Sequence, residues 1–192
     1  MWTRRRPEPP TIEVPARIEL PNATHLRQFE ERDARAVADA VRVSLEHLGP
    51  WMAWADAASC DPGFQRRRIR GLPMLAARSE EWQYGIFTDA DENLLGSVGL
   101  HARRGPGVLE IGYWLHVDAV GNGYVTVAAG ALTELGLGLP GIDEMLIYCD
   151  VTNAASAAVP RRLGYTHERT ERRAPTAPGE TGQMMRWAKR TA

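Results

Sequence analysis

A pair of glycines in the second half of the chain is the clearest chemical signal. A predicted strand ends at Leu115-His116-Val117, and after a link over 118–120, Gly121-Asn122-Gly123 begins a predicted helix. Glycine permits a tight turn and a close approach of the backbone to a ligand. The first turn of a helix leaves amide N–H groups unpaired at the positive end of the helix dipole. Together these features can hold a pyrophosphate, although a plain turn with a glycine N-cap explains the same three residues equally well.

Two other phosphate-binding motifs do not fit this segment. A P-loop closes with glycine, lysine and then serine or threonine, and no lysine is present here. A dinucleotide-binding fingerprint needs a third glycine or an alanine where the chain has Thr126. An antiparallel meander is predicted before the turn, whereas that fingerprint belongs to a strand-helix-strand unit. The phosphate site is therefore of another class.

A carboxylate on the preceding strand is the best candidate for a general base. Strand alternation puts Glu110 on the same face as Gly112, Trp114 and His116. A carboxylate within so apolar a strand is unusual, and a positioned carboxylate can take a proton directly or through a water molecule. The alternative is a strand glutamate that faces solvent or pairs with an arginine.

The elements that carry these residues follow from the hydrophobic pattern. Val37, Val41, Leu45 and Leu48 recur at helical spacing behind Asp33, a good helix N-cap. Alternating segments separated by turn residues predict two successive hairpins in the middle of the chain. We predict helices over 34–48, 64–77, 121–135 and 153–163, and strands over 23–29, 82–88, 94–101, 108–117, 145–149, 165–172 and 183–187.

The order of these elements predicts an α/β (α+β) fold. A mixed, mostly antiparallel central sheet flanked by helices on both faces is the natural packing. Residues 1–22 are rich in proline and arginine and are predicted to be a loosely ordered lead-in, and residues 23–192 a single domain. A chain of 192 residues suffices for one sizeable core.

Four motifs in order resemble the GNAT superfamily of N-acetyltransferases. Within it, the chain is most similar to the RimJ/RimL type, the N-terminal acetyltransferases of ribosomal proteins and their small-molecule relatives. The resemblance covers roughly residues 24–190 and includes the upstream segment Leu48–Trp54. The motifs are Glu110-Ile111-Gly112-Tyr113-Trp114-Leu115-His116, Gly121-Asn122-Gly123-Tyr124, Cys149-Asp150-Val151-Thr152-Asn153-Ala154-Ala155-Ser156 and Arg161-Arg162-Leu163-Gly164-Tyr165.

The resemblance implies a GNAT fold with acetyl-CoA as the acyl donor, and it implies roles for particular residues. The backbone around Leu115, His116 and Val117 would pair with the pantetheine arm as an added strand does. Asn153 would hydrogen-bond the pantetheine, and Ser156 would face the sulfur. The remaining cofactor contacts would be the amides of Gly121, Asn122, Gly123, Tyr124 and Val125 and the side chain of Arg161 or Arg162.

Three positions depart from the family pattern. Asp118 stands where many members have glutamine or arginine, and Val127 where close relatives often have glutamate. Pro160 occupies the place of a tyrosine that protonates the thiolate in many GNAT enzymes, and proline has no proton to give. Ser156 or a water molecule is therefore the predicted acid.

The acceptor side carries weaker signals. Trp51, Trp54 and Tyr113 are predicted to contact the acceptor, although the two tryptophans are equally consistent with a core or a lid. His101 and His116 are predicted to be ordinary strand histidines. Cys149, in an apolar strand, is predicted to be an inert core thiol.

Composition and charge indicate which partners, metal sites and cellular locations to expect. The formal net charge is -1, so a nucleic-acid partner is not indicated. Cys60 and Cys149 lie far apart without metal-ligand spacing, and we expect neither a disulfide framework nor a metal site. No apolar run approaches the roughly 18 residues that span a bilayer, and prolines follow the arginines at the start instead of an apolar signal segment. We expect a cytoplasmic monomer or homodimer.

The predicted activity is acetyl transfer to a primary amine. The favoured acceptor is the N-terminal α-amine of a peptide or protein, because its pKa near 7.7–8.0 leaves a useful fraction neutral, whereas lysine near 10.4 needs a stronger base. Acetylation of a small-molecule amine, such as a metabolite or antibiotic, is the alternative within the enzyme class. A non-catalytic module that binds acyl-CoA as a sensor is the alternative from another class.

Overall fold

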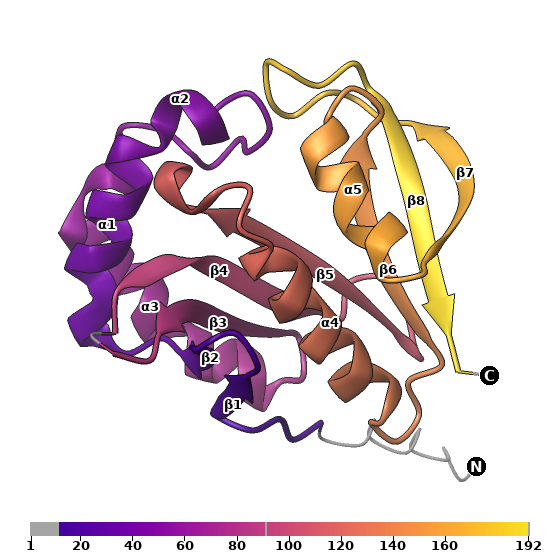
Figure 1. The fold of residues 1–192 in the computed structure, drawn as a ribbon, viewed down its shortest axis with the longest axis horizontal. Helices are drawn as coiled ribbons and strands as arrows, with labels where there is room; N and C mark the ends of the chain where they lie inside the picture. The colour runs from indigo at the N-terminus through magenta and orange to yellow at the C-terminus, as the bar shows by residue number, and fades with distance from the viewer. Residues whose placement is uncertain (1–11, 91, 192) are drawn as a thin grey trace, which may run out of the picture.

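The computed structural model describes residues 12–90 and 92–191. They form one eight-stranded sheet in the order β1-β2-β3-β4-β5-β6-β8-β7 (Figure 1). Every neighbouring pair is antiparallel except β5 and β6, which run parallel. The strands are β1 (Arg17–Leu20), β2 (Thr24–Gln28), β3 (Glu81–Thr88), β4 (Leu94–His101), β5 (Val108–Leu115), β6 (Glu144–Asp150), β7 (Thr166–Arg172) and β8 (Gln183–Arg190).

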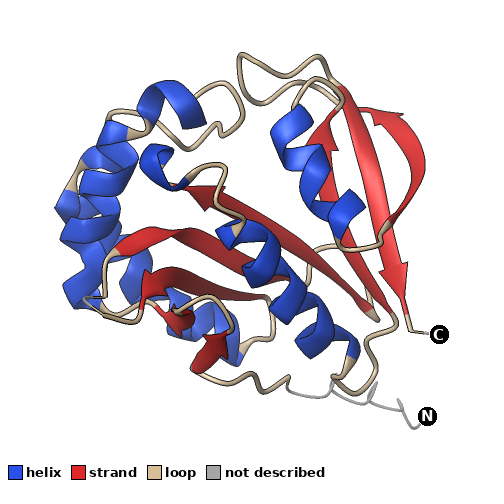
Figure 2. Cartoon of the chain, in the orientation of Figure 1, coloured by secondary structure: helices blue, strands red, loops and turns tan. Residues whose placement is uncertain are grey.

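Helices cover both faces of the sheet, as Figures 1 and 2 show. One face carries α4 (Tyr124–Leu137) and α5 (Ala154–Arg162), and the other carries α1 (Ala34–Val43), α2 (Leu45–Leu48) and α3 (Pro62–Ala77). Two buried clusters correspond to these faces, the first around Leu109 and Ile111, the second around Phe87 and Trp114. The predicted mixed sheet between two helical layers is thus confirmed. Among the described residues, no helix is long and apolar enough to cross a membrane.

The sheet begins earlier in the chain than predicted. β1 lies inside the segment predicted to be a loosely ordered lead-in, and it pairs with β2 from Arg17↔Arg27 to Leu20↔Thr24. Ile12, Val14 and Ile18 pack against the larger core cluster. Arg17-Ile18-Glu19-Leu20 alternates between polar and apolar residues, but the strand has only four residues and follows a proline-rich segment, and the edge of β2 supplies its partners. The rest of the predicted lead-in, 1–11, lies outside the described residues.

The helix predicted over 34–48 is divided into α1 and α2 at Ser44. Ser44 is fully buried, and its Oγ accepts a hydrogen bond from the N–H of Val117 at 3.0 Å. Asp33 does not cap α1 with its side chain. Its carboxylate instead pairs with the guanidinium of Arg27 at 2.9 and 3.0 Å and accepts from the N–H of Glu30. Both differences arise from contacts with distant segments, which local periodicity does not contain.

The parallel strands β5 and β6 separate halfway along their length. Their register runs from Val108↔Glu144 to Ile111↔Ile147 and then stops. Beyond Ile111, β5 follows β4 as far as Leu115, while β6 follows β8 as far as Asp150. Figure 1 shows the two strands diverging above this point. The sheet therefore opens at Gly112, with one edge of each strand left without a strand partner.

Candidate active site

A cavity of about 590 Å³ lies at the opening between β5 and β6. Its walls come from both helical layers and from the diverging strands. The structure brings together six of the residues predicted as catalytic, cofactor-binding or substrate-binding, namely Trp51, Trp54, Glu110, Tyr113, Asn153 and Ser156. The other lining residues include Phe64, Arg68, Glu81, His101, Arg103, Arg104, Gly112, Trp114, Tyr148, Cys149 and Arg173.

The predicted pyrophosphate turn forms an exposed helix N-terminus on the α4 side. Gly121 and Gly123 have φ angles of 86° and 79°, in the left-handed region that favours glycine. The first bonded amide of α4 is that of Val127, which donates to the carbonyl of Gly123 at 3.1 Å. The amides before it therefore lie at the open end of the helix, and the residues from Gly121 to Gly123 are exposed. This end of α4 can accept an anionic group.

Backbone groups just after β5 already form hydrogen bonds within the protein. Val117 donates its N–H to Ser44 Oγ, and its carbonyl accepts from Val120 at 3.4 Å. The N–H of His116 is donated to the carbonyl of Leu95 at 2.8 Å, and its Nδ1 accepts from the N–H of Asp118. The N–H of Val117 is thus already engaged, and the pairing of the Leu115 and Val117 backbone with the pantetheine stays a prediction. The unpaired edge of β5, from Gly112 to Leu115, remains available for an added strand.

The N-terminus of α5 brings three predicted residues together. Asn153 caps the helix, since its Oδ1 accepts from the N–H of Ser156 at 3.0 Å. The cap engages the amide oxygen of Asn153 and leaves its Nδ2 for a ligand. The Oη of Tyr113 donates to the carbonyl of Ser156 at 3.0 Å and lies 3.1 Å from its Oγ. Burial raises the pKa of Tyr113. Ser156 Oγ therefore lies beside a neutral phenol at the opening of the sheet.

Arg161, Arg162 and Cys149 are the remaining candidate residues on and near α5. Arg162 is exposed in the last turn of α5, and the guanidinium of Arg161 lies 5.6 Å from the ring centroid of Trp187. Cys149 is buried on β6 and lines the cavity, and burial raises the pKa of its thiol to about 11. A thiol with this pKa is almost wholly protonated at neutral pH, which suits an inert role.

Glu110 lies in the cavity wall and is held by two arginines. Its side chain is buried and forms ion pairs with Arg103 and with Arg104. Burial acts to raise the pKa of this carboxyl, but the hydrogen bonds and charges of the two arginines outweigh it and hold the pKa below its ordinary value. The carboxylate is therefore ionised and has low basicity, and the arrangement matches the arginine-paired alternative of the sequence analysis.

His101 was predicted to be an ordinary strand histidine, but it lies between a carboxylate and the point where the sheet opens. Its Nδ1 lies 3.4 Å from Oε2 of Glu81, and this hydrogen bond is the main cause that lowers the pKa of Glu81. Its Nε2 would lie only 3.1 Å from a Cβ placed at Gly112, so the missing side chain at 112 leaves room for the imidazole. Gly112 is the residue at which the sheet opens.

His101 thus has a carboxylate beside Nδ1, while Nε2 faces the space left by Gly112. A histidine oriented in this way can act as a general base. The signal in the sequence was weak. It consisted of a histidine at the end of one strand and a glycine in the middle of the next strand, and only the register of β4 and β5 places them side by side.

Aromatic side chains form the wall on the α3 side of the cavity. The rings of Trp54 and Trp114 meet edge to face, with centroids 5.9 Å apart. Trp54 is 42% exposed, whereas Trp114 is buried in the core cluster of α1 and α3. Trp54 therefore lies at the exposed rim of the cavity, and its contact with the acceptor stays a prediction.

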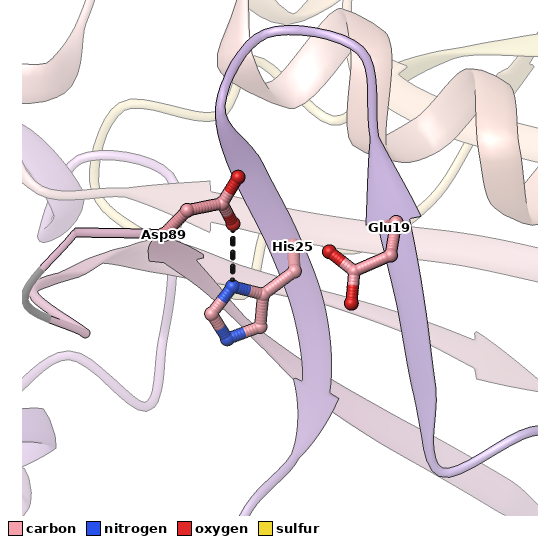
Figure 3. A group of neighbouring side chains, drawn as sticks. All are labelled: Glu19, His25 and Asp89. Atoms are coloured by element: carbon pink, nitrogen blue, oxygen red, sulfur yellow. Dashed lines mark hydrogen bonds and ion pairs between the residues drawn. The ribbon is translucent and has the colours of Figure 1, made fainter.

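A separate cluster at the edge of the sheet resembles a metal site in composition only. The ligand atoms of Glu19, His25 and Asp89 lie within 4.8 Å of one another (Figure 3). His25 Nδ1 is 2.8 Å from Asp89 Oδ1, while Glu19 is paired with Arg17. The Nε2 of His25 is buried without a hydrogen-bond partner. A metal-bound histidine usually donates its second N–H to an oriented acceptor, so this cluster is explained by ion pairing.

The fold and the cavity define an N-acetyltransferase. The chain belongs to the GNAT family, because residues 24–166 match the model of the acetyltransferase (GNAT) domain. A relative from Bacillus subtilis (strain 168), named as a ribosomal N-acetyltransferase, YdaF, is 26% identical over 144 residues, which are 74% of this chain and 78% of the relative. The predicted family is thus confirmed.

Solved structures agree with this assignment. RimL, a ribosomal α-N-protein acetyltransferase in complex with coenzyme A, is 25% identical, with a TM-score of 0.80 over 91% of this chain and 97% of that one. In that complex, coenzyme A is joined by a disulfide to a cysteine. The self-immunity acetyltransferase MccE, in complex with acetyl-CoA and AMP, is 21% identical, with a TM-score of 0.82 over 93% of this chain and 98% of that one. The second likeness shows the fold alone.

Proposed function

We propose that this protein transfers the acetyl group of acetyl-CoA to the N-terminal α-amine of a peptide or protein. The observation that carries the proposal is the cavity at the opening between β5 and β6, because it brings Asn153 and Ser156 at the N-terminus of α5 together with an aromatic wall on the α3 side of the sheet. The names of RimL and YdaF support a ribosomal or other peptide acceptor. The cytoplasmic location and the monomeric or dimeric state stay predictions.

The residues fit acetyl-CoA as the donor, which supplies an activated thioester when bound. The open amides at Gly121 to Val125 would hold its pyrophosphate, with Arg162 as a further phosphate contact. The free edge of β5 near Leu115 and the Nδ2 of Asn153 would hold the pantetheine. Ser156 Oγ would face the sulfur, where it can donate a proton to the departing thiolate.

Two side chains can take the proton of the amine. Glu110 is the candidate from the sequence, but its two arginines lower the pKa of its carboxyl and weaken it as a base. His101 has an open Nε2 beside Gly112, on the face of the sheet that also carries Trp114. We propose that His101 is the base and that Glu81 orients it. Glu110 then positions Arg103 and Arg104 through its two ion pairs. The acceptor would approach from the side of Trp51 and Trp54.

A panel of amines tests the acceptor. Release of coenzyme A thiol should be measured with peptides that have a free N-terminus and an internal lysine, with the same peptides acetylated at the N-terminus, and with small amines. We expect at least about tenfold higher kcat/KM for free N-termini than for lysine side chains, because a larger fraction of the α-amine than of the lysine amine is neutral at neutral pH.

Blocked peptides serve as the matched control, since they differ only at the reacting nitrogen. Turnover with small amines alone would replace the peptide with a small-molecule acceptor. Acyl-CoA binding without transfer to any amine of the panel would contradict the proposed enzyme and favour a sensor.

Replacement of Ser156 tests the proposed acid. Ser156→Ala removes the hydroxyl next to Tyr113 Oη but keeps the backbone that caps α5 with Asn153. We expect turnover to fall about tenfold, the order of one lost hydrogen bond, because water can still protonate the thiolate. The affinity for CoA, measured by calorimetry, should change less than turnover. Normal turnover at every pH would leave water as the acid.

A further inference from the structure

The arginines of the cavity wall form ion pairs with carboxylates, with one exception. Four arginines line the cavity, and three of them form ion pairs with carboxylates. These pairs are Arg103 with Glu110, Arg104 with Glu110, and Arg173 with Glu171. Arg68 forms no ion pair with a carboxylate of the described residues, and Glu81 acts on it only as a nearby charge. The fourth arginine is thus a cation without a counterion.

The guanidinium of Arg68 is held in place by its own helix. Gln65 and Arg68 are three residues apart on α3 and so lie on the same face. Gln65 is 1% exposed, and its Nε2 donates to the carbonyl of Ser59 at 2.6 Å. Its Oε1 accepts from Nε of Arg68 at 3.1 Å. The buried amide therefore fixes one side of the guanidinium and leaves its terminal nitrogens for a ligand.

Partial burial makes this unpaired charge unfavourable in the free protein. Arg68 is half-buried, and burial lowers its pKa, with Glu81 acting in the opposite direction. The oxygens of Glu81 are already engaged, one by His101 at 3.4 Å and one by Gln83 at 3.0 Å. A partly desolvated guanidinium gains most from a carboxylate that can accept two parallel hydrogen bonds.

The position of Arg68 relates it to the reacting amine. His101 lies beside Gly112 at the opening of the sheet, Glu81 pairs with His101, and Arg68 lines the same cavity as all three. An acceptor whose amine reaches the opening would therefore extend its next residues toward α3. We propose that Arg68 binds an acidic side chain of the acceptor, so that peptides with aspartate or glutamate at the second or third residue are preferred; this inference rests on the proposed function.

Paired peptides test this preference. Two serine-initiated peptides should be compared, one with glutamate and one with glutamine at the second and third residues. For the wild-type protein loaded with acetyl-CoA, we expect kcat/KM to be about 10- to 100-fold higher for the glutamate peptide, the effect of one hydrogen-bonded charge. The difference should lie mainly in KM and should shrink as salt is added.

Variants on the same helix assign the effect to Arg68. In Arg68→Gln the ratio of the two peptides should fall to near 1, and in Arg68→Glu a lysine-bearing peptide should become the better acceptor. Arg67→Gln is the matched control, because Arg67 is exposed on the same helix and does not line the cavity. Equal use of both peptides by the wild type, or an unchanged preference in Arg68→Gln, would overturn the inference.

A binding measurement separates this inference from the proposed function. If no peptide of the panel is acetylated, the peptide acceptor fails, and calorimetry with the CoA-loaded protein then decides about Arg68. Tighter binding of the glutamate peptide, lost in Arg68→Gln, would keep the anion site. Binding without preference for either peptide would remove it. Acetylation of O-phosphoserine but of no peptide would support an anion site at Arg68. It would overturn the inference that the anion belongs to a peptide.

Discussion

Replacement of Gly121 and Gly123 by valine should abolish measurable binding of CoA. Both glycines have a positive φ, which a β-branched residue adopts only with strain. Each added side chain would occupy the space in front of the first amides of α4, where the phosphates are proposed to bind. The loss of two or more charge-assisted hydrogen bonds, about 1.5–3 kcal/mol each, predicts a fall in affinity of more than about 100-fold. Isothermal calorimetry with CoA measures it directly.

Gly141 provides a control for the backbone strain. It also has a positive φ, of 78°, and a Cβ there would meet no atom within 4 Å, as at Gly121 and Gly123. It lies beyond the opposite end of α4, so Gly141→Val should introduce the strain of one such substitution and still bind CoA. Thermal unfolding of each variant would confirm that folded protein is compared. Unchanged CoA affinity in the double valine variant would place the cofactor elsewhere.

The choice between His101 and Glu110 as the base predicts the second large effect. We expect His101→Gln to lower turnover by about 10²–10⁴-fold, the range of a general base, with little change in CoA affinity. Glutamine can still hydrogen-bond Glu81 but takes no proton. Glu110→Gln should lower turnover by less than about tenfold, since Arg103 and Arg104 already weaken that carboxylate as a base.

The pH dependence distinguishes the two bases further. The pKa of Glu110 is lowered from 4.5, so this carboxyl stays ionised above that pH and contributes no ionisation near neutrality. A pH dependence of turnover near neutrality therefore does not come from Glu110, and partial recovery of turnover in His101→Ala with added imidazole would support His101 as the base.

The exposed His167 on β7 is the matched control, and His167→Ala should keep wild-type turnover. Full activity in His101→Gln together with a loss of 10²-fold or more in Glu110→Gln would restore the glutamate as the base.

Local patterns in the sequence determined most of the secondary structure. β4 was predicted over 94–101, as observed, and β3, β5, β6, β7 and α5 were predicted to within a few residues. The glycine turn before α4 was predicted for the same reason, since turn chemistry and a positive φ depend on neighbouring residues. The order of the elements also determined the mixed sheet with helices on both faces, because few packings satisfy that order.

The tertiary structure decided which side chains meet. β1 has only four residues and forms because β2 offers a free edge. Ser44 interrupts the first helix and binds Val117, which is 73 positions away in the sequence. The pairing of Glu110 with two arginines, the contact of His101 with Gly112 and the isolation of Arg68 all depend on register and on the packing of α3. Local periodicity carries no information about such distant partners, and these partners weaken Glu110 as a base and leave Arg68 without an ion pair within the described part of the chain.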